Sequence, residues 1–150
     1  MPEIVYLDVC CFKRPFDDAG FKRIRREAEA VAEILEAVQR GTLRLVRSPA
    51  HDFENERNPR EDRRLATRIW LDAADVRVEA DSVPEHRSRE LTSLGFAPLD
   101  ALHIAFAEEA HAKWFATTDD QIIKRASAHR DELRVTIVGP EEIPAKGNPQ

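Results

Sequence analysis

The sequence predicts an α/β protein, a three-layer α/β/α sandwich in which a parallel sheet of about five strands lies between helices. Short, β-prone apolar runs alternate with longer amphipathic segments along the whole chain. Such alternation is typical of parallel strands joined by helical crossovers, which pack on the two faces of the sheet. No repeat, low-complexity segment or linker divides the 150 residues, so we expect a single domain over residues 1–150.

Five short segments have the composition of strands. The first, residues 4–7, reads Ile-Val-Tyr-Leu and ends directly before Asp8. A short apolar run of this kind is typical of a buried strand. The other predicted strands are residues 43–46, 76–79, 114–116 and 135–138.

Helical periodicity is clearest between the first two strands. Apolar residues at positions 24, 28, 31, 35 and 38 recur at spacings of four and three, and Gly41 ends the pattern. We expect a polar loop before this helix, over residues 13–20, and an irregular tail over residues 140–150. Further helices are predicted over residues 50–56, 60–74, 84–94 and 121–128, together with one that begins near Asp100.

Composition and charge are those of an ordinary soluble protein. No apolar run approaches the ~18 residues of a membrane span and no signal segment opens the chain, so we expect a cytoplasmic protein without a membrane partner. Cys10 and Cys11 are the only cysteines and are adjacent, which favours small apolar side chains in a reducing compartment over a disulfide framework. The net charge of −5 weakly opposes a nucleic-acid coat protein but allows an enzyme with a local basic patch.

Three aspartates occupy positions where a functional site is expected. Asp8 and Asp119 follow the first and fourth predicted strands, and ligands of parallel α/β sheets gather beyond the carboxyl ends of strands. Asp100 opens an almost wholly apolar helix, where a lone buried charge is costly. Taken singly, each acid is also typical of a helix cap or a solvated side chain.

With these acids in this order, the chain resembles the PIN-domain family over residues 3–140. The resemblance is carried by Ile-Val-Tyr-Leu-Asp8, Leu-Asp100-Ala-Leu-His-Ile-Ala and Thr-Thr-Asp119. The stretch from Leu7 to Asp18 is similar to that of stand-alone bacterial PIN proteins of the VapC type. The resemblance implies an α/β/α sandwich with strand order 3-2-1-4-5 and a divalent-metal-dependent ribonuclease.

The family also has a second acid, usually a glutamate about six residues past the second strand. Counting from Ser48 identifies Glu54 as this residue, with Asp52 and Glu56 as competitors. The family often carries a hydroxyl or amide residue just after the first aspartate. Here that place is taken by Val9 and Cys10, so a substrate contact from such a residue is in doubt.

Four carboxylates in one pocket suit a hard divalent cation. Each ionised carboxylate raises the pKa of its neighbours, so a group of them needs a compensating charge. Mg²⁺ or Mn²⁺ binds oxygen ligands, retains water and contacts phosphate oxygens. Such an ion activates water and neutralises charge during attack on an RNA phosphodiester. We assign Asp8 and Asp119 as direct ligands and catalytic residues, with Asp100 and Glu54 completing the site directly or through water.

Several other residues are candidates for contact with the substrate. Basic residues at 60, 63, 64 and 68 share one predicted helical face, and a second basic cluster lies at 22–26; interleaved acids also allow both faces to be simply solvated. His103 lies one turn after Asp100 and is expected to pack near the site, because a zinc site would need more closely spaced ligands. The substrate-binding candidates are Arg14, Arg60, Arg64, His103, Thr117 and Thr118.

Other enzyme classes fit the sequence poorly. A haloacid-dehalogenase-type phosphatase needs an aspartate at position 10, which is a cysteine, and the chain has no Gly-x-x-x-x-Gly-Lys phosphate loop. The strands after Val76 and Val135 lack the acid and lysine that a response-regulator receiver requires.

The sequence therefore predicts a metal-dependent endoribonuclease, and the resemblance implies the toxin of a type II toxin–antitoxin pair. Its expected partners are an RNA substrate, a cognate antitoxin and, as is frequent in such proteins, a second copy of the chain. The rival hypothesis is a PIN-fold protein that binds RNA or a partner without cutting.

Overall fold

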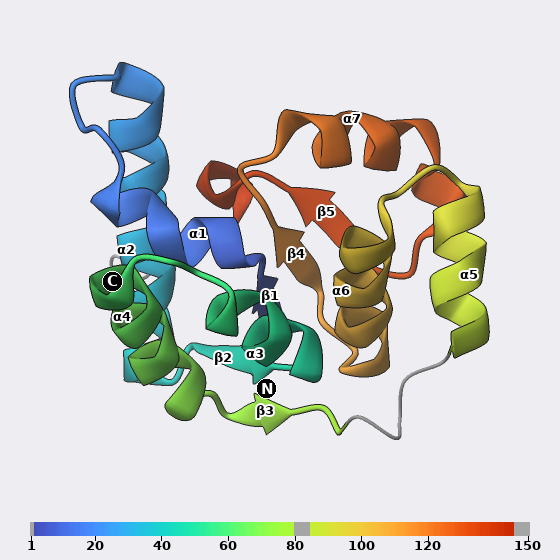
Figure 1. The fold of residues 1–150 in the computed structure, drawn as a ribbon, viewed down its shortest axis with the longest axis horizontal. Helices are drawn as coiled ribbons and strands as arrows, with labels where there is room; N and C mark the ends of the chain where they lie inside the picture. Colours follow the sequence, from blue (N-terminus) through green and yellow to red (C-terminus); the bar gives the residue numbers. More distant parts are fainter. Residues whose placement is uncertain (1, 80–84, 146–150) are drawn as a thin grey trace.

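The computed structural model describes residues 2–79 and 85–145, and it confirms the predicted fold class. All strand pairs are parallel and form one sheet in the order β3-β2-β1-β4-β5, with helices on both faces (Figure 1). The strands are β1 (Glu3–Leu7), β2 (Leu43–Arg47), β3 (Val76–Arg77), β4 (Trp114–Ala116) and β5 (Thr136–Val138).

The connections between strands are mostly helical. The α-helices are α1 (Val9–Lys13), α2 (Lys22–Arg40), α3 (Pro49–Glu56), α4 (Glu61–Asp72), α5 (Glu85–Ser93), α6 (Pro98–Glu109) and α7 (Asp120–Ala128). Three 3₁₀ turns, η1 (Arg14–Phe16), η3 (Arg130–Glu132) and η4 (Pro140–Glu142), complete the described chain.

The central strand β1 supplies side chains to two separate apolar cores. Tyr6 points into a core formed with α5, α6 and α7, whereas Val5 and Leu7 point into a core formed with α1, α2 and α4. Successive residues of a strand face opposite sides of the sheet, so β1 is buried on both faces. This explains why its sequence is continuously apolar instead of alternating.

The predicted long helix is observed as α2. Of the predicted apolar stripe, Val31, Leu35 and Val38 are buried, whereas Ile24 and Ala28 in the first half of the helix are only half-buried. Gly41 has a left-handed backbone (φ 80°), and its N–H donates to the carbonyls of Ala37 and Val38. A glycine adopts this conformation without strain, so it ends the helix where the sequence predicts.

The chain after Asp8 contains more helix than the polar loop predicted over residues 13–20. Lys13 ends α1 and the next three residues form η1. The short helix is stabilised because Asp8 caps its first turn and because Cys11 and Phe12 are buried. Five residues are too few to show a helical period, so only tertiary packing determines this element.

Two other segments differ from the prediction. The third strand is limited to Val76–Arg77, although the Val78 N–H still donates to the Arg47 carbonyl at 2.9 Å. The C-terminal segment is packed rather than irregular as far as residue 145, since η4 is followed by Ile143 and Ala145, each 6% exposed. Residues 146–150 and the predicted helix start at 84 lie outside the described residues.

A search of the described helices for a segment with the length and apolar character of a membrane span finds none.

Candidate functional site

The carboxyl ends of β1 and β4 form the floor of the candidate site. The two strands are neighbours, and the Asp8 N–H donates to the Ala116 carbonyl at 2.9 Å, which extends their pairing by one residue. Because β2 and β4 flank β1 on opposite sides, the strand order reverses here, as is typical of ligand sites in parallel α/β sheets.

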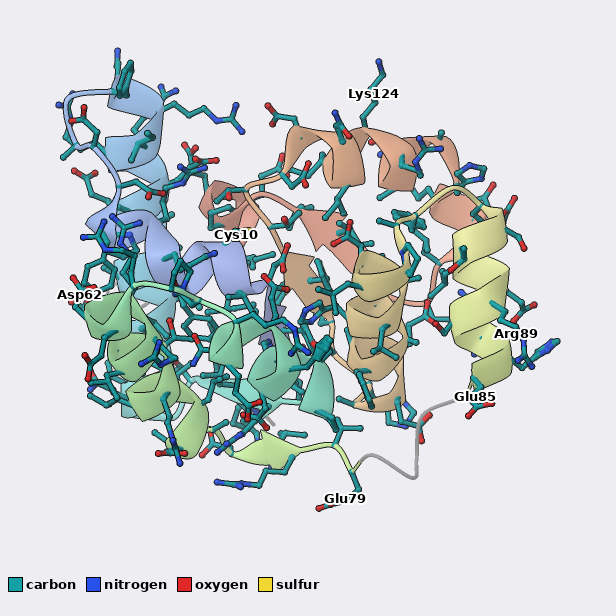
Figure 2. All side chains as sticks on the ribbon, in the orientation of Figure 1. Cys10, Asp62, Glu79, Glu85, Arg89 and Lys124 are labelled. Carbon is teal, nitrogen blue, oxygen red and sulfur yellow. The ribbon has the colours of Figure 1, made fainter. Side chains whose placement is uncertain are left out.

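Asp8 is held rigidly in this position and is only 6% exposed. Its Oδ1 accepts a hydrogen bond from the Val9 N–H at 2.9 Å, and its Oδ2 accepts one from Thr117 Oγ1 at 2.8 Å. Cys10, near the middle of the molecule in Figure 2, places its Sγ 3.4 Å from Oδ2. Burial raises the pKa of Asp8, while His103 and Thr117 act in the opposite direction.

Glu54 and His103 reach Asp8 from two helices, α3 and α6. His103 Nε2 lies 2.9 Å from Glu54 Oε1. The imidazole is fully buried, whereas the Glu54 side chain remains 28% exposed. One ligand atom from each of Asp8, Glu54 and His103 lies within 4.8 Å of the other two, which is close enough for a shared cation.

A buried hydrogen-bonded chain extends behind His103. Its Nδ1 lies 2.6 Å from the Tyr6 hydroxyl, which in turn lies 2.7 Å from Ser48 Oγ. Burial raises the pKa of Tyr6 well above its usual value, so the phenol keeps its proton. Ser48 also caps α3, and its Oγ lies 3.4 Å from the His51 Nδ1.

His51 is a neutral base at the end of this chain. Burial lowers the pKa of His51 to about 3, so the ring carries a single proton at neutral pH. That proton is on Nε2, which lies 2.7 Å from the Leu7 carbonyl, an acceptor only. Nδ1 is therefore an acceptor, and it receives the Ser48 N–H at 3.1 Å.

Asp100 belongs to the same electrostatic neighbourhood. It lies in the first turn of α6 and is partly buried, but the N-cap of the helix is Ala97, so Asp100 does not serve as the cap. The pKa of Asp100 is raised to about 6, mainly by burial and then by the carboxylates of Asp8, Asp119 and Glu54, against the opposing influence of the His103 imidazole. Asp100 is thus influenced by the other three predicted acids.

Asp119 occupies the outer edge of the group. It is exposed and caps α7, with Oδ1 accepting the Gln121 N–H at 2.9 Å. Asp119 therefore influences the pKa of Asp100 but does not belong to the close group of Asp8, Glu54 and His103.

The competing acids on α3 point elsewhere. Asp52 accepts from Arg47 Nη2 at 2.8 Å. Glu56 is exposed and lines a different pocket, together with Arg64 and Arg68. Glu54 is the acid of this helix that the structure brings to Asp8.

The basic residues predicted on one helical face are divided between two pockets. One pocket of about 400 Å³ lies beside Cys10 and Thr118 and is lined by Lys13, Arg14, Asn58, Arg60 and Arg63. Arg64 instead donates to the Asn58 carbonyl at 2.9 Å and lines the second pocket, which Arg47 also lines. Of the predicted substrate contacts, Arg14 and Arg60 thus lie together, and Arg64 does not.

The two threonines after β4 have different roles. Thr117 is fully buried and orients Asp8, so its hydroxyl is used inside the protein. Thr118 lines the basic pocket, and its carbonyl accepts from Arg23 Nη2 at 3.2 Å. Arg23 also forms an ion pair with the exposed Asp120 at 2.6 Å, which joins the start of α2 to the start of α7.

Sequence reasoning missed the polar network of Tyr6, Ser48 and His51. Tyr6 lies in an apolar strand and is read as core, which it also is: its ring stacks on Phe115 at 5.2 Å. The Ser48-Pro49 pair before α3 is a recognisable helix start, but its link to Tyr6 spans 42 residues.

Comparison of the chain with models of known protein families and with curated proteins gives no match.

Proposed function

We propose that this protein is a divalent-metal-dependent endoribonuclease of the PIN type. The observation that carries the proposal is the convergence of Asp8, Glu54 and His103, whose ligand atoms lie within 4.8 Å of one another. Burial, and then the carboxylates of Asp8, Asp119 and Glu54, raise the pKa of Asp100 to about 6. In the folded protein, these carboxylates lie close together at one edge of the sheet and repel one another. Such an arrangement is costly for a structural role and useful for holding a cation.

The donor set fits Mg²⁺ or Mn²⁺. Within residues 2–79 and 85–145, no lysine or arginine forms an ion pair with Asp8, Asp100 or Asp119. Among the described residues, the repulsion is therefore opposed by the His103 imidazole and by hydrogen bonds, and by no lysine or arginine ion pair. Carboxylate oxygens are the ligands that these ions prefer, and such an ion supplies an activated water and neutralises charge on a phosphodiester.

The protein's own groups prepare the carboxylates for this task. Thr117 and the Val9 N–H fix the two oxygens of Asp8, so its orientation does not depend on a ligand. His103 fixes Glu54 from the opposite side. Hydrogen bonds of this kind orient metal ligands and tune their basicity.

The basic pocket beside Cys10 supports RNA as the substrate. Lys13, Arg60 and Arg63 line it, and the Cys10 thiol connects it to Asp8. An RNA strand whose phosphates contact these basic side chains would lie next to Cys10, whose Sγ is 3.4 Å from Asp8 Oδ2. The net charge of −5 is no obstacle, because phosphate contacts depend on a local patch.

The resemblance to VapC-type proteins supports a role as a type II toxin. In that role the partners would be a cognate antitoxin covering the site and a second copy of the chain. Growth arrest on expression, relieved by the Asp8→Asn substitution, is the expected behaviour of such a toxin.

A circular single-stranded RNA tests the proposed activity, since only an endonuclease can open it. The wild-type protein should linearise the circle with Mg²⁺ or Mn²⁺ and not in EDTA. Asp8→Asn should lower the rate at least ~100-fold, because an ion contributes several kcal/mol to the transition state. Glu85→Gln is the control, since Glu85 is exposed at the start of α5, on the opposite side of the molecule from Cys10 in Figure 2, and this variant should cleave normally.

If the wild-type protein binds the circle but cleaves it with neither metal, the non-cutting RNA-binding hypothesis replaces this proposal. Equal cleavage by wild type and Asp8→Asn would indicate a contaminating nuclease.

A further inference from the structure

His103 stands in the position of a metal ligand. Its Nε2 faces Glu54 and Asp8, and the ligand atoms of the three residues lie within 4.8 Å of one another. The ring is fully buried, so Nε2 has no access to bulk water that could compete with an ion.

The separation between His103 and Glu54 fits two ligands of a single ion. Nε2 and Oε1 are 2.9 Å apart. Ligands at right angles on an ion whose bonds are about 2.1 Å long lie about 3 Å apart. An ion could therefore replace the shared proton with little movement of either side chain.

The buried hydrogen-bonded chain behind His103 allows an ion to replace the proton on Nε2 at little cost in free energy. With the His103 proton on Nε2, Ser48 donates to Tyr6 and Tyr6 donates to Nδ1. With that proton on Nδ1, these two bonds reverse: His103 donates to Tyr6 and Tyr6 donates to Ser48, whose hydroxyl hydrogen then faces the His51 Nδ1, 3.4 Å away. The His51 Nδ1 accepts a hydrogen bond in either case, because the only proton of this ring is on Nε2, which faces the Leu7 carbonyl.

Both directions thus satisfy the buried hydroxyls, and the reversed direction frees the Nε2 lone pair. A histidine that binds a metal through one nitrogen commonly donates from the other, which fixes its tautomer. Here the Tyr6 hydroxyl, 2.6 Å from Nδ1, is that acceptor.

We propose that His103 Nε2 binds the ion directly, beside Asp8 and Glu54, and that the site consequently selects a first-row transition-metal ion over Mg²⁺. Imidazole nitrogen is a good ligand for ions such as Zn²⁺ and Fe²⁺ and is tolerated by Mn²⁺, whereas Mg²⁺ favours an all-oxygen shell. The inference rests on the proposed metal-dependent function and adds a nitrogen ligand to it.

Electron paramagnetic resonance of bound Mn²⁺ tests this ligand directly. Electron spin-echo modulation should show coupling to ¹⁴N in the wild-type protein, and ¹⁵N-histidine labelling should change the pattern. His103→Gln should abolish the coupling and weaken Mn²⁺ binding about tenfold or more, with a smaller effect on Mg²⁺. His86→Gln on α5 is the matched control, because His86 is exposed, and should retain the coupling.

The wild-type and isotope measurements need no substitution, so they decide the question even if His103→Gln fails to fold. Bound Mn²⁺ without histidine coupling, in a protein that still cleaves RNA, would overturn the nitrogen ligand and leave the nuclease proposal intact. Absence of any Mn²⁺ binding would overturn both.

Discussion

Asp100 reduces the stability of the folded protein near neutral pH. Its pKa of about 6 lies above the ordinary value of 3.8, mainly because burial disfavours the charged form. Between these two values the folded state binds more protons than the unfolded state. Stability of the metal-free protein therefore falls, as far as this group is concerned, while the pH rises from about 4 to about 6.

We predict that Asp100→Asn stabilises the metal-free protein at pH 7.5 by no more than about 1 kcal/mol, since solvent still screens this partly exposed group. The gain should shrink towards pH 4.5, where the folded wild-type carboxyl is protonated. Denaturant unfolding in EDTA at the two pH values measures the difference. Asp62→Asn serves as the exposed control; an Asp100→Asn effect that is the same at both pH values would contradict the explanation.

At this same scale, single residues differ in how well a sequence reveals them. Asp8 and Asp100 could be identified from the sequence as candidate site residues, because a charged residue inside or next to an apolar run is conspicuous. Counting residues past the second strand favoured Glu54 as the second acid but left Asp52 as a competitor. The structure shows that an ion pair with Arg47 holds Asp52 away from the site. The Tyr6–His103 contact joins residues 97 apart, so no local pattern indicates it.

Among the elements, α6 has the most demanding position, because it carries both Asp100 and His103 through the core. Its outer end is fixed by a buried ion pair between Glu108 and Arg87 of α5, with Nε and Oε1 2.7 Å apart. Glu108 also accepts the Arg134 N–H at 2.8 Å, and Arg87 donates to the Glu132 carbonyl at 2.7 Å. The pair thus connects α5, α6 and the segment before β5.

We predict that Arg87→Met destabilises the protein by about 3–5 kcal/mol, because Glu108 is left as a buried, unpaired charge. The double variant Arg87→Met/Glu108→Leu should be less destabilised than Arg87→Met, since no isolated charge remains. Urea unfolding measures both. Arg68→Met is the control, because Arg68 and its partner Asp72 are both exposed, and it should cost less than about 1 kcal/mol. A double variant less stable than Arg87→Met would contradict the prediction.

Elements of the sheet were more predictable than the short helices. The continuous apolar composition of β1 and β4 reflects burial on both faces, which a sequence displays directly. By contrast α1 has five residues and owes its shape to the Asp8 cap and to packing. The order of the strands is fixed by contacts between distant segments, and here it was available only through resemblance to a family.

For the whole molecule, the distribution of charge matters more than its sum. An acidic protein with a net charge of −5 is expected to repel RNA at long range. The pocket beside Cys10 gathers four basic side chains, Lys13, Arg14, Arg60 and Arg63, against one acid, Asp17. Binding should therefore depend on a few phosphate contacts and weaken with added salt.

We predict that Arg60→Ala lowers the slope of log K against log salt for single-stranded RNA by about 0.7, the loss of one phosphate contact. Arg89→Ala is the matched control, because Arg89 points outward from α5 at the far end of the molecule (Figure 2), and should leave the slope unchanged. Fluorescence anisotropy in EDTA measures binding without cleavage. Equal slopes for wild type and Arg60→Ala would exclude this pocket as the RNA path.

The pairing of β1 with β4 also has a consequence during synthesis. Asp8 leaves the ribosome early, but Thr117, which orients it, is 109 residues further along the chain. A nascent polypeptide consequently has no assembled acid group until Thr117 has emerged. If the proposed activity is correct, products truncated before this residue are harmless, and the translating ribosome and its messenger are exposed to the nuclease only after β4 has left the tunnel.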